Sequence, residues 1–176
     1  MNMLRALAVS TLVLWGVCYA DQDRVVRIRT DGTLSEIPAQ FGPSMLRVRF
    51  SKSSERPISS LELTLGTQTN RLPTCVTRFL PAVRLEDIGA SGSWNHDETR
   101  LPYYVTVRFF DSGYDGKSSD RPGYALHFNL RTARLIKMQV IVVSNRGKDV
   151  WVHLVPVDLA LICSPSELPE LKGVPK

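Results

Sequence analysis

Residues 91–98 bring together the three residue types that a serine hydrolase uses. Such an enzyme needs a base within hydrogen-bond reach of a serine hydroxyl and a carboxylate behind that base. His96 could serve as the base and Asp97 as an acidic partner. The nucleophile elbow of many hydrolases has the motif Gly-x-Ser-x-Gly. Residues 89–93 depart from it, because Ser93 occupies the position of the second glycine. A cell-envelope hydrolase that uses His96 with an acidic partner is therefore the alternative function.

The same residues are also typical of a contact surface on a loop. Trp94 lies next to His96 and Asp97 in the sequence, and Tyr114 occupies the middle of a later polar stretch. Aromatic rings with polar edges give much contact area for little lost side-chain entropy, so they often anchor protein interfaces. We predict a binding surface formed by Trp94, His96, Asp97 and Tyr114, acting by contact rather than by turnover.

Residues 111–120 resemble part of a calcium-binding loop, with Asp111 and Asp115 at its first and fifth positions. Gly113 occupies the third position and Pro122 the twelfth, so too few oxygen ligands converge for calcium. The three histidines are dispersed and the cysteines lack the paired spacing of a zinc motif. We expect no metal and no cofactor.

Four arginines form the third group of candidate binding residues. Arg27 and Arg29 share one strand face, and Arg47 and Arg49 share another. If these two strands are neighbours, the guanidinium groups would line one patch that could grip carboxylates or phosphates. The alternative is a solvated sheet face with interspersed acids.

Residues 1–20 predict an exported protein. They carry one positive charge, Arg5, followed by an apolar run that is short for a membrane span, and they end in small residues before Asp21. We expect cleavage of a signal peptide before Asp21. A lipoprotein cut before Cys18 is the alternative. The location would be the periplasm in a Gram-negative bacterium, and otherwise the protein would be secreted.

The cysteine content supports export. Once Cys18 is removed with the signal peptide, only Cys75 and Cys163 remain, an even number in an oxidising compartment. We predict that they form a disulfide. Two buried free thiols are the alternative.

Composition and charge limit the classes of partner. The chain has 43% hydrophobic residues, and its net charge of +5 is spread along the sequence rather than gathered in one run. This modest charge does not predict nucleic-acid binding. No second apolar stretch of membrane length follows, so we expect a soluble, not transmembrane, protein whose partner is another exported or envelope protein.

Apolar residues alternate with polar ones along most of the remaining chain, which is typical of half-buried strands. We predict a single β-rich domain over residues 21–176: an antiparallel β-sandwich or barrel with one or two short helical turns. The turns are expected over residues 74–79 and 164–167, and a flexible tail over about 168–176. The expected strands are residues 46–50, 61–65, 103–109, 124–130, 134–143, 150–157 and 157–163.

Together these features favour a non-enzymatic exported binding protein of an inhibitor- or immunity-like kind, with loop surfaces on a β scaffold. A structural subunit of a surface assembly is a third hypothesis. It would require an unpaired edge strand, which the sequence alone cannot reveal.

Overall fold

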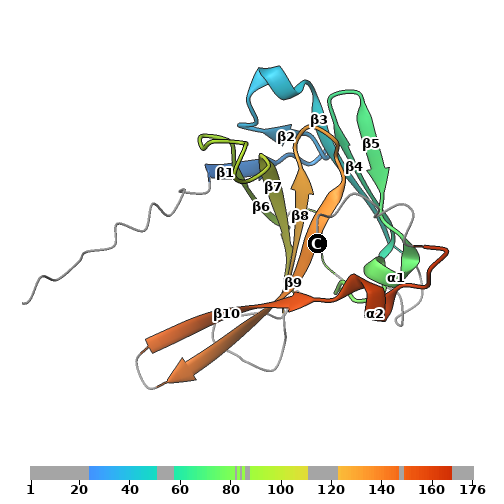
Figure 1. Ribbon diagram of the computed structural model, residues 1–176, viewed down its shortest axis with the longest axis vertical. Coiled ribbons are helices and arrows are strands. Elements are labelled where there is room, and N and C mark those ends of the chain that lie inside the picture. Colours follow the sequence, from blue (N-terminus) through green and yellow to red (C-terminus); the bar gives the residue numbers. More distant parts are fainter. Residues whose placement is uncertain are drawn as a thin grey trace, which may run out of the picture.

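The computed structural model describes residues 24–50, 58–81, 83, 85, 88–110, 123–146 and 149–167, with the backbone alone for 144–146 and 149–151. These residues form two antiparallel sheets, and this confirms the predicted all-β fold (Figure 1). The predicted signal peptide (residues 1–20), the loop 111–120 with Tyr114, and the tail 168–176 lie outside the described residues.

The larger sheet has seven strands in the order β10-β9-β8-β7-β6-β1-β2. From β6 to β10 each strand pairs with the next one in the chain, because short connections favour antiparallel neighbours. The strands are β1 (Arg24–Ile28), β2 (Leu34–Ser35), β6 (Gly89–Ser93), β7 (Tyr104–Phe109), β8 (Gly123–Asn129), β9 (Leu135–Arg146) and β10 (Asp149–Val157).

The smaller sheet consists of β3 (Ser44–Phe50), β4 (Ile58–Leu65) and β5 (Gln68–Arg71), in that order. A single bridge between Thr33 and Met45 connects it to the larger sheet. Next to this bridge, the Leu46 N–H donates to the Gly32 carbonyl over 2.8 Å. A Cβ at Gly32 would lie 2.2 Å from the Leu46 carbonyl oxygen, so only glycine allows this close approach.

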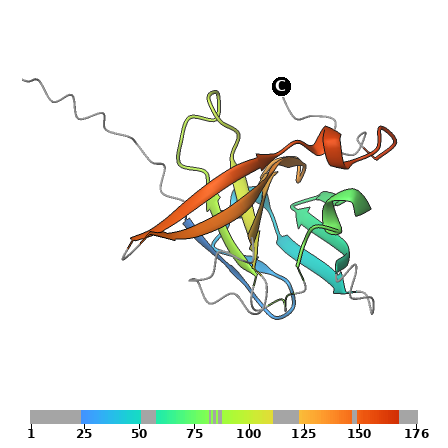
Figure 2. The same cartoon turned by 90° about the horizontal axis from the view of Figure 1, so that it is seen from below.

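The hydrophobic core lies between the two sheets, which face each other in Figure 2. Alternate side chains of the strands β4, β7 and β8 point into it, as the period-two pattern predicted. Leu61 and Leu63 of β4 and Val105 and Val107 of β7 are all fully buried there. Phe128 of β8 is buried equally well.

Two short helices cover one end of the core, α1 (Thr74–Thr77) and α2 (Leu159–Ile162). The predicted disulfide joins them: Cys75 and Cys163 are bonded, with their Cα atoms 5.1 Å apart. The prediction of a strand over 157–163 was wrong. The Asp158 carboxylate accepts a hydrogen bond from the Ala160 N–H and so caps a helical turn instead.

The predicted turn over 164–167 is present. Glu167 reaches back so that one carboxylate oxygen accepts from the Ser164 N–H, at 3.1 Å, and the other from the Cys75 N–H, at 3.3 Å. These hydrogen bonds hold the pKa of Glu167 below its usual value. The end of the described chain is thereby fastened to α1.

Candidate functional site

The loop that the sequence singled out follows a strand that the sequence analysis missed. β6 lies between β1 and β7 within the larger sheet, and residues 89–93 were not among the expected strands. Its residues are Gly, Ala and Ser, so no large apolar side chain marks it as a strand. Ala90, Ser91, Gly92 and Ser93 are nevertheless all buried. The loop of residues 94–103 begins where β6 ends.

Trp94 is the first residue of this loop, and its side chain belongs to the hydrophobic core. Only 9% of it is exposed. The ring lies against Gly92, where a Cβ would come within 2.3 Å of ring carbon Cζ3. The prediction of an exposed aromatic anchor at Trp94 was therefore wrong, because the missing side chain at Gly92 leaves room for the ring beside the sheet.

His96 ties the two ends of the loop together. Its Nε2 lies 2.9 Å from the Leu101 carbonyl oxygen, which can only accept a hydrogen bond. The neutral ring therefore carries its proton on Nε2, and Nδ1 accepts from the Ser93 hydroxyl over 3.1 Å. This is the geometry of a nucleophile and its base. Ser93 is only 2% exposed, however, so a substrate carbonyl has little access to its hydroxyl.

The His96 ring also packs edge-on against Tyr103, with ring centroids 5.3 Å apart. Tyr103 in turn packs edge-on against Phe41, at 5.8 Å. Such edge-to-face pairs are favourable beyond the area that they bury. These contacts place His96 among the supports of the loop.

Asp97 stabilises the turn within the loop. One of its carboxylate oxygens accepts from the Thr99 N–H at 3.0 Å and from the Thr99 hydroxyl at 2.7 Å. These two hydrogen bonds hold the pKa of Asp97 below its usual value of 3.8. The side chain that was predicted to contact a partner thus has an internal role.

The loop faces the turn that connects β8 to β9. The Arg131 Nε donates to both carboxylate oxygens of Glu98, at 2.7 and 2.9 Å. The hydrogen bonds and the charge of Glu98 raise the pKa of Arg131. The Leu130 N–H also donates to the Tyr103 carbonyl, at 2.9 Å. Loop and turn are therefore held at a defined separation.

Between them lies a groove of about 720 Å³. This volume falls within the range of roughly 300 to 1,000 Å³ that is usual for ligand clefts. Arg100, Arg134 and Lys137 supply positive charge along it, and Glu98, the acid in its lining, is paired with Arg131. The lining residues are Glu98, Thr99, Arg100, Leu101, Pro102, Asn129, Thr132, Arg134, Leu135, Ile136 and Lys137.

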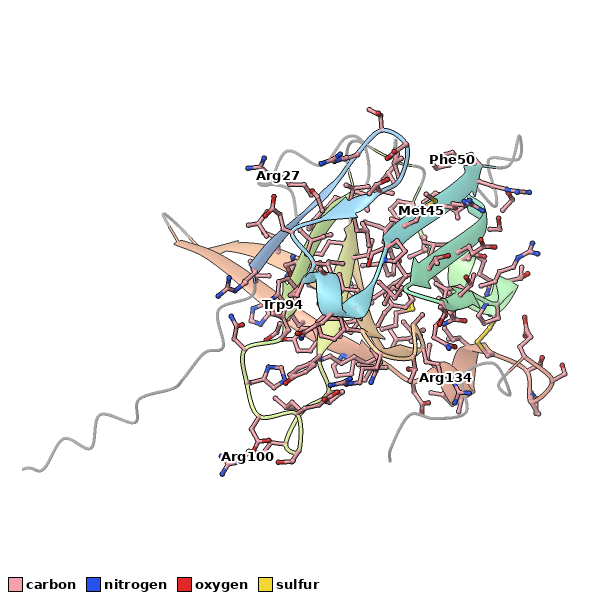
Figure 3. The ribbon with its side chains drawn as sticks, turned by 90° about the horizontal axis from the view of Figure 1, so that it is seen from above. Arg27, Met45, Phe50, Trp94, Arg100 and Arg134 are labelled. Carbon is pink, nitrogen blue, oxygen red and sulfur yellow. A yellow bond between two sulfur atoms is a disulfide. The ribbon has the colours of Figure 1, made fainter. Side chains whose placement is uncertain are left out.

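Figure 3 shows Arg100 and Arg134 toward the same side of the molecule, one on the loop and the other on the β8–β9 turn. Arg100 and Leu101 are exposed, the latter by 57%. The sequence analysis missed both residues, and Lys137 as well. The signal available in the sequence is a cation next to a leucine, Arg100-Leu101, at the end of a polar stretch.

The structure does not bring the four strand arginines together. β1, which carries Arg27, pairs with β6 and β2, whereas β3, which carries Arg47 and Arg49, pairs with β4. The condition for a shared arginine patch is therefore not met. Arg47 lies 3.7 Å from the carboxylate of Glu62, its cross-strand neighbour, which matches the alternative of a face with interspersed acids.

A second histidine lies in a polar row across the outer face of the larger sheet. His127 Nδ1 is 2.8 Å from the Thr106 hydroxyl, and its Nε2 is 2.8 Å from the Gln139 amide oxygen. Thr106 is fully buried, so this row is satisfied internally rather than open to a substrate. Within the described ranges, no group of three His, Cys, Asp or Glu residues could hold a metal ion.

Comparison with known proteins identifies no relative of this chain. The chain matches no family model, no curated protein and no solved structure. In the part of the chain that the structure describes, no helix has the length and apolar character needed to cross a membrane.

Proposed function

We propose that this chain is an exported, non-enzymatic binding protein that holds an acidic segment of a partner protein in the groove between the 94–103 loop and the β8–β9 turn. The main support for the proposal is that cations line the groove, whereas Glu98, the acid in its lining, is already paired. Arg131 engages both carboxylate oxygens of Glu98, so the charge that the groove presents to a ligand is positive.

Positive charge favours an acidic ligand through electrostatic complementarity. Arg100 and Lys137 lie on opposite walls of the groove, and neither forms an ion pair with any residue that the structure describes. An extended acidic segment lying between the walls could place carboxylates against both. Guanidinium groups add directional hydrogen bonds to carboxylates.

The apolar lining favours a peptide over an anionic glycan. Leu101, Pro102 and Ile136 line the same groove as the cations. A polypeptide can cover these side chains with its own apolar residues, whereas a sugar acid offers little apolar surface. Burial of apolar area on both sides would contribute to affinity.

The internal order of the loop supports binding by a preformed surface. The hydrogen bonds of His96, Asp97 and Glu98 already restrict the loop, so little conformational entropy would be lost on binding. Export is supported by the Cys75–Cys163 disulfide, since such bonds persist mainly in oxidising compartments.

A capture experiment with charge-reversal variants tests this proposal. The immobilised protein would be exposed to the exported fraction of its host, and the wild type would be compared with a variant that combines Arg100→Glu and Lys137→Glu. We expect the captured partner to be lost, with affinity lowered by at least about tenfold, or 1.4 kcal/mol. Binding of the wild type should also weaken as salt is added.

Arg71→Glu is the control, because Arg71 is exposed on β5 and lies outside the groove. It should bind like the wild type. Equal binding by the groove variant and the wild type would refute the proposed site. Thermal melts of all three proteins would show that the differences do not arise from unfolding.

A further inference from the structure

The last strand of the larger sheet has a free edge. β10 pairs with β9 along its whole length, from Asp149 opposite Arg146 to Val157 opposite Met138. On its other side it pairs with no strand of the described chain. The backbone N–H and carbonyl groups of that edge are therefore available to another strand.

The side chains of β10 make this edge unusual. Val152 and Leu154 are 59% and 52% exposed on one face of the sheet, and Val155 is 48% exposed on the other. Residues 150–157 contain no Lys, Arg, Asp or Glu, and His153 is their one titratable residue. Monomeric proteins usually protect an edge with charged side chains, particularly lysine. Pro156, which lacks a backbone N–H, protects one position of this edge.

The strand also belongs to a ribbon that extends beyond the rest of the sheet. β8 pairs with β9 only as far as Ile141, opposite Gly123, whereas β10 follows β9 to Arg146. Figures 1 and 2 both show the β9–β10 hairpin projecting away from the two sheets. A two-stranded ribbon is marginally stable in water, and a third strand would stabilise it.

We infer that the occupant of this edge is a second copy of the chain, whose β10 pairs antiparallel with the first about a two-fold axis perpendicular to the sheet. Such an axis keeps each face of the sheet on the same side in both copies. Val152 and Leu154 of the two copies then form one continuous apolar surface. Val155 of each copy lies on the opposite surface.

The absence of charge along this edge favours a second copy over a charged segment of another protein. Residues 150–157 carry no charged side chain that could pair with a charged peptide, and a charged side chain brought to this edge would lose water without compensation. Residues 150–157 of a second copy carry the same uncharged side chains, with Val152 and Leu154 on one face and Val155 on the other. Few side chains take part, so the association should be reversible and depend on concentration.

Sedimentation velocity of the oxidised, exported protein tests this inference over about a hundredfold range of concentration. The wild type should pass from monomer to dimer as concentration rises. Leu154→Lys places a charge on the edge and should raise the dimer dissociation constant at least about tenfold. Val25→Lys is the matched control, because Val25 is 71% exposed on β1, an interior strand of the same sheet. It should dimerise like the wild type.

Either of two results would overturn the inference. The first is a wild type that stays monomeric at every concentration, which is also what a heterologous strand on this edge would produce. The second is a Leu154→Lys variant that is folded by circular dichroism and still dimerises like the wild type. Loss of partner capture by the groove variant bears on neither result, so the two proposals can fail separately.

Discussion

The indole ring of Trp94 lies so close to Gly92 that a Cβ at residue 92 would come within 2.3 Å of ring carbon Cζ3. Gly92 belongs to a buried strand, and Trp94 begins the loop that forms one wall of the groove. The contact therefore fixes the direction in which the loop leaves the sheet. It also assigns Trp94 to packing, whereas Arg100 and Leu101 of the same loop are exposed.

Replacement of Trp94 by alanine should lower stability, because it leaves a cavity beside β6. The expected loss is about 3 to 5 kcal/mol in the free energy of unfolding. The matched variant is Leu101→Ala, whose side chain is 57% exposed. It should leave the melting temperature nearly unchanged while weakening partner capture. An unchanged melting temperature for Trp94→Ala would contradict the packing role of Trp94 and favour a role in binding a partner.

The disulfide should account for a large part of the stability. Cys75 and Cys163 are 88 positions apart, and closing a long loop restricts the unfolded chain. Cys163→Ser should lower the free energy of unfolding by about 2 to 5 kcal/mol under oxidising conditions. Denaturant titration measures this loss. Reduction of the disulfide in the wild type should lower the free energy of unfolding by a similar amount. Equal stability of the oxidised and reduced wild type would contradict the prediction.

The contribution of Asp97 should depend on pH. Its folded-state pKa lies below the usual value of 3.8, so its hydrogen bonds to Thr99 stabilise the loop above that pH. This stabilisation is lost as the pH falls through the lowered folded-state pKa. Carbon NMR of the Asp97 carboxyl during acid titration measures the value directly. Asp97→Asn should remove this pH dependence, and a carboxyl that titrates at or above 3.8 would contradict the account.

The Ser93–His96 pair allows a direct test of the hydrolase alternative. Because Ser93 is 2% exposed, a serine-directed fluorophosphonate probe should not label it in the folded protein. Ser93→Ala should instead loosen the loop, since His96 loses the hydroxyl on Nδ1, and hydrogen exchange at the Leu101 amide should quicken. Labelling of Ser93 in the folded protein would favour an enzyme over a binding protein.

Much of the fold could be predicted from period-two patterns, because a strand with one buried face must alternate. This applies to the strands that contain Leu46, Leu61, Val105 and Phe128. β6 could not be recognised in this way, since its small residues show no apolar alternation. The alternation of Leu159 and Leu161 is typical of a strand, but the hydrogen bond from the Ala160 N–H to the Asp158 carboxylate stabilises a helical turn instead.

The internal roles of the loop residues could not be predicted from the sequence. The sequence directed attention to the loop, but His96 and Asp97 maintain its shape. The groove joins residues 98–102 to residues 129–137, and contact between segments so far apart depends on the pairing of β7 with β8. No local pattern in the sequence reports that pairing.

NMR titration with a synthetic acidic peptide that alternates glutamate and leucine tests the binding groove most directly. Amide shifts should concentrate in residues 98–102 and 132–137 and diminish with added salt. They should vanish in the variant that combines Arg100→Glu and Lys137→Glu. Shifts centred on the strand arginines Arg27 and Arg49, or no saturable shifts at all, would show that this groove does not bind an acidic segment.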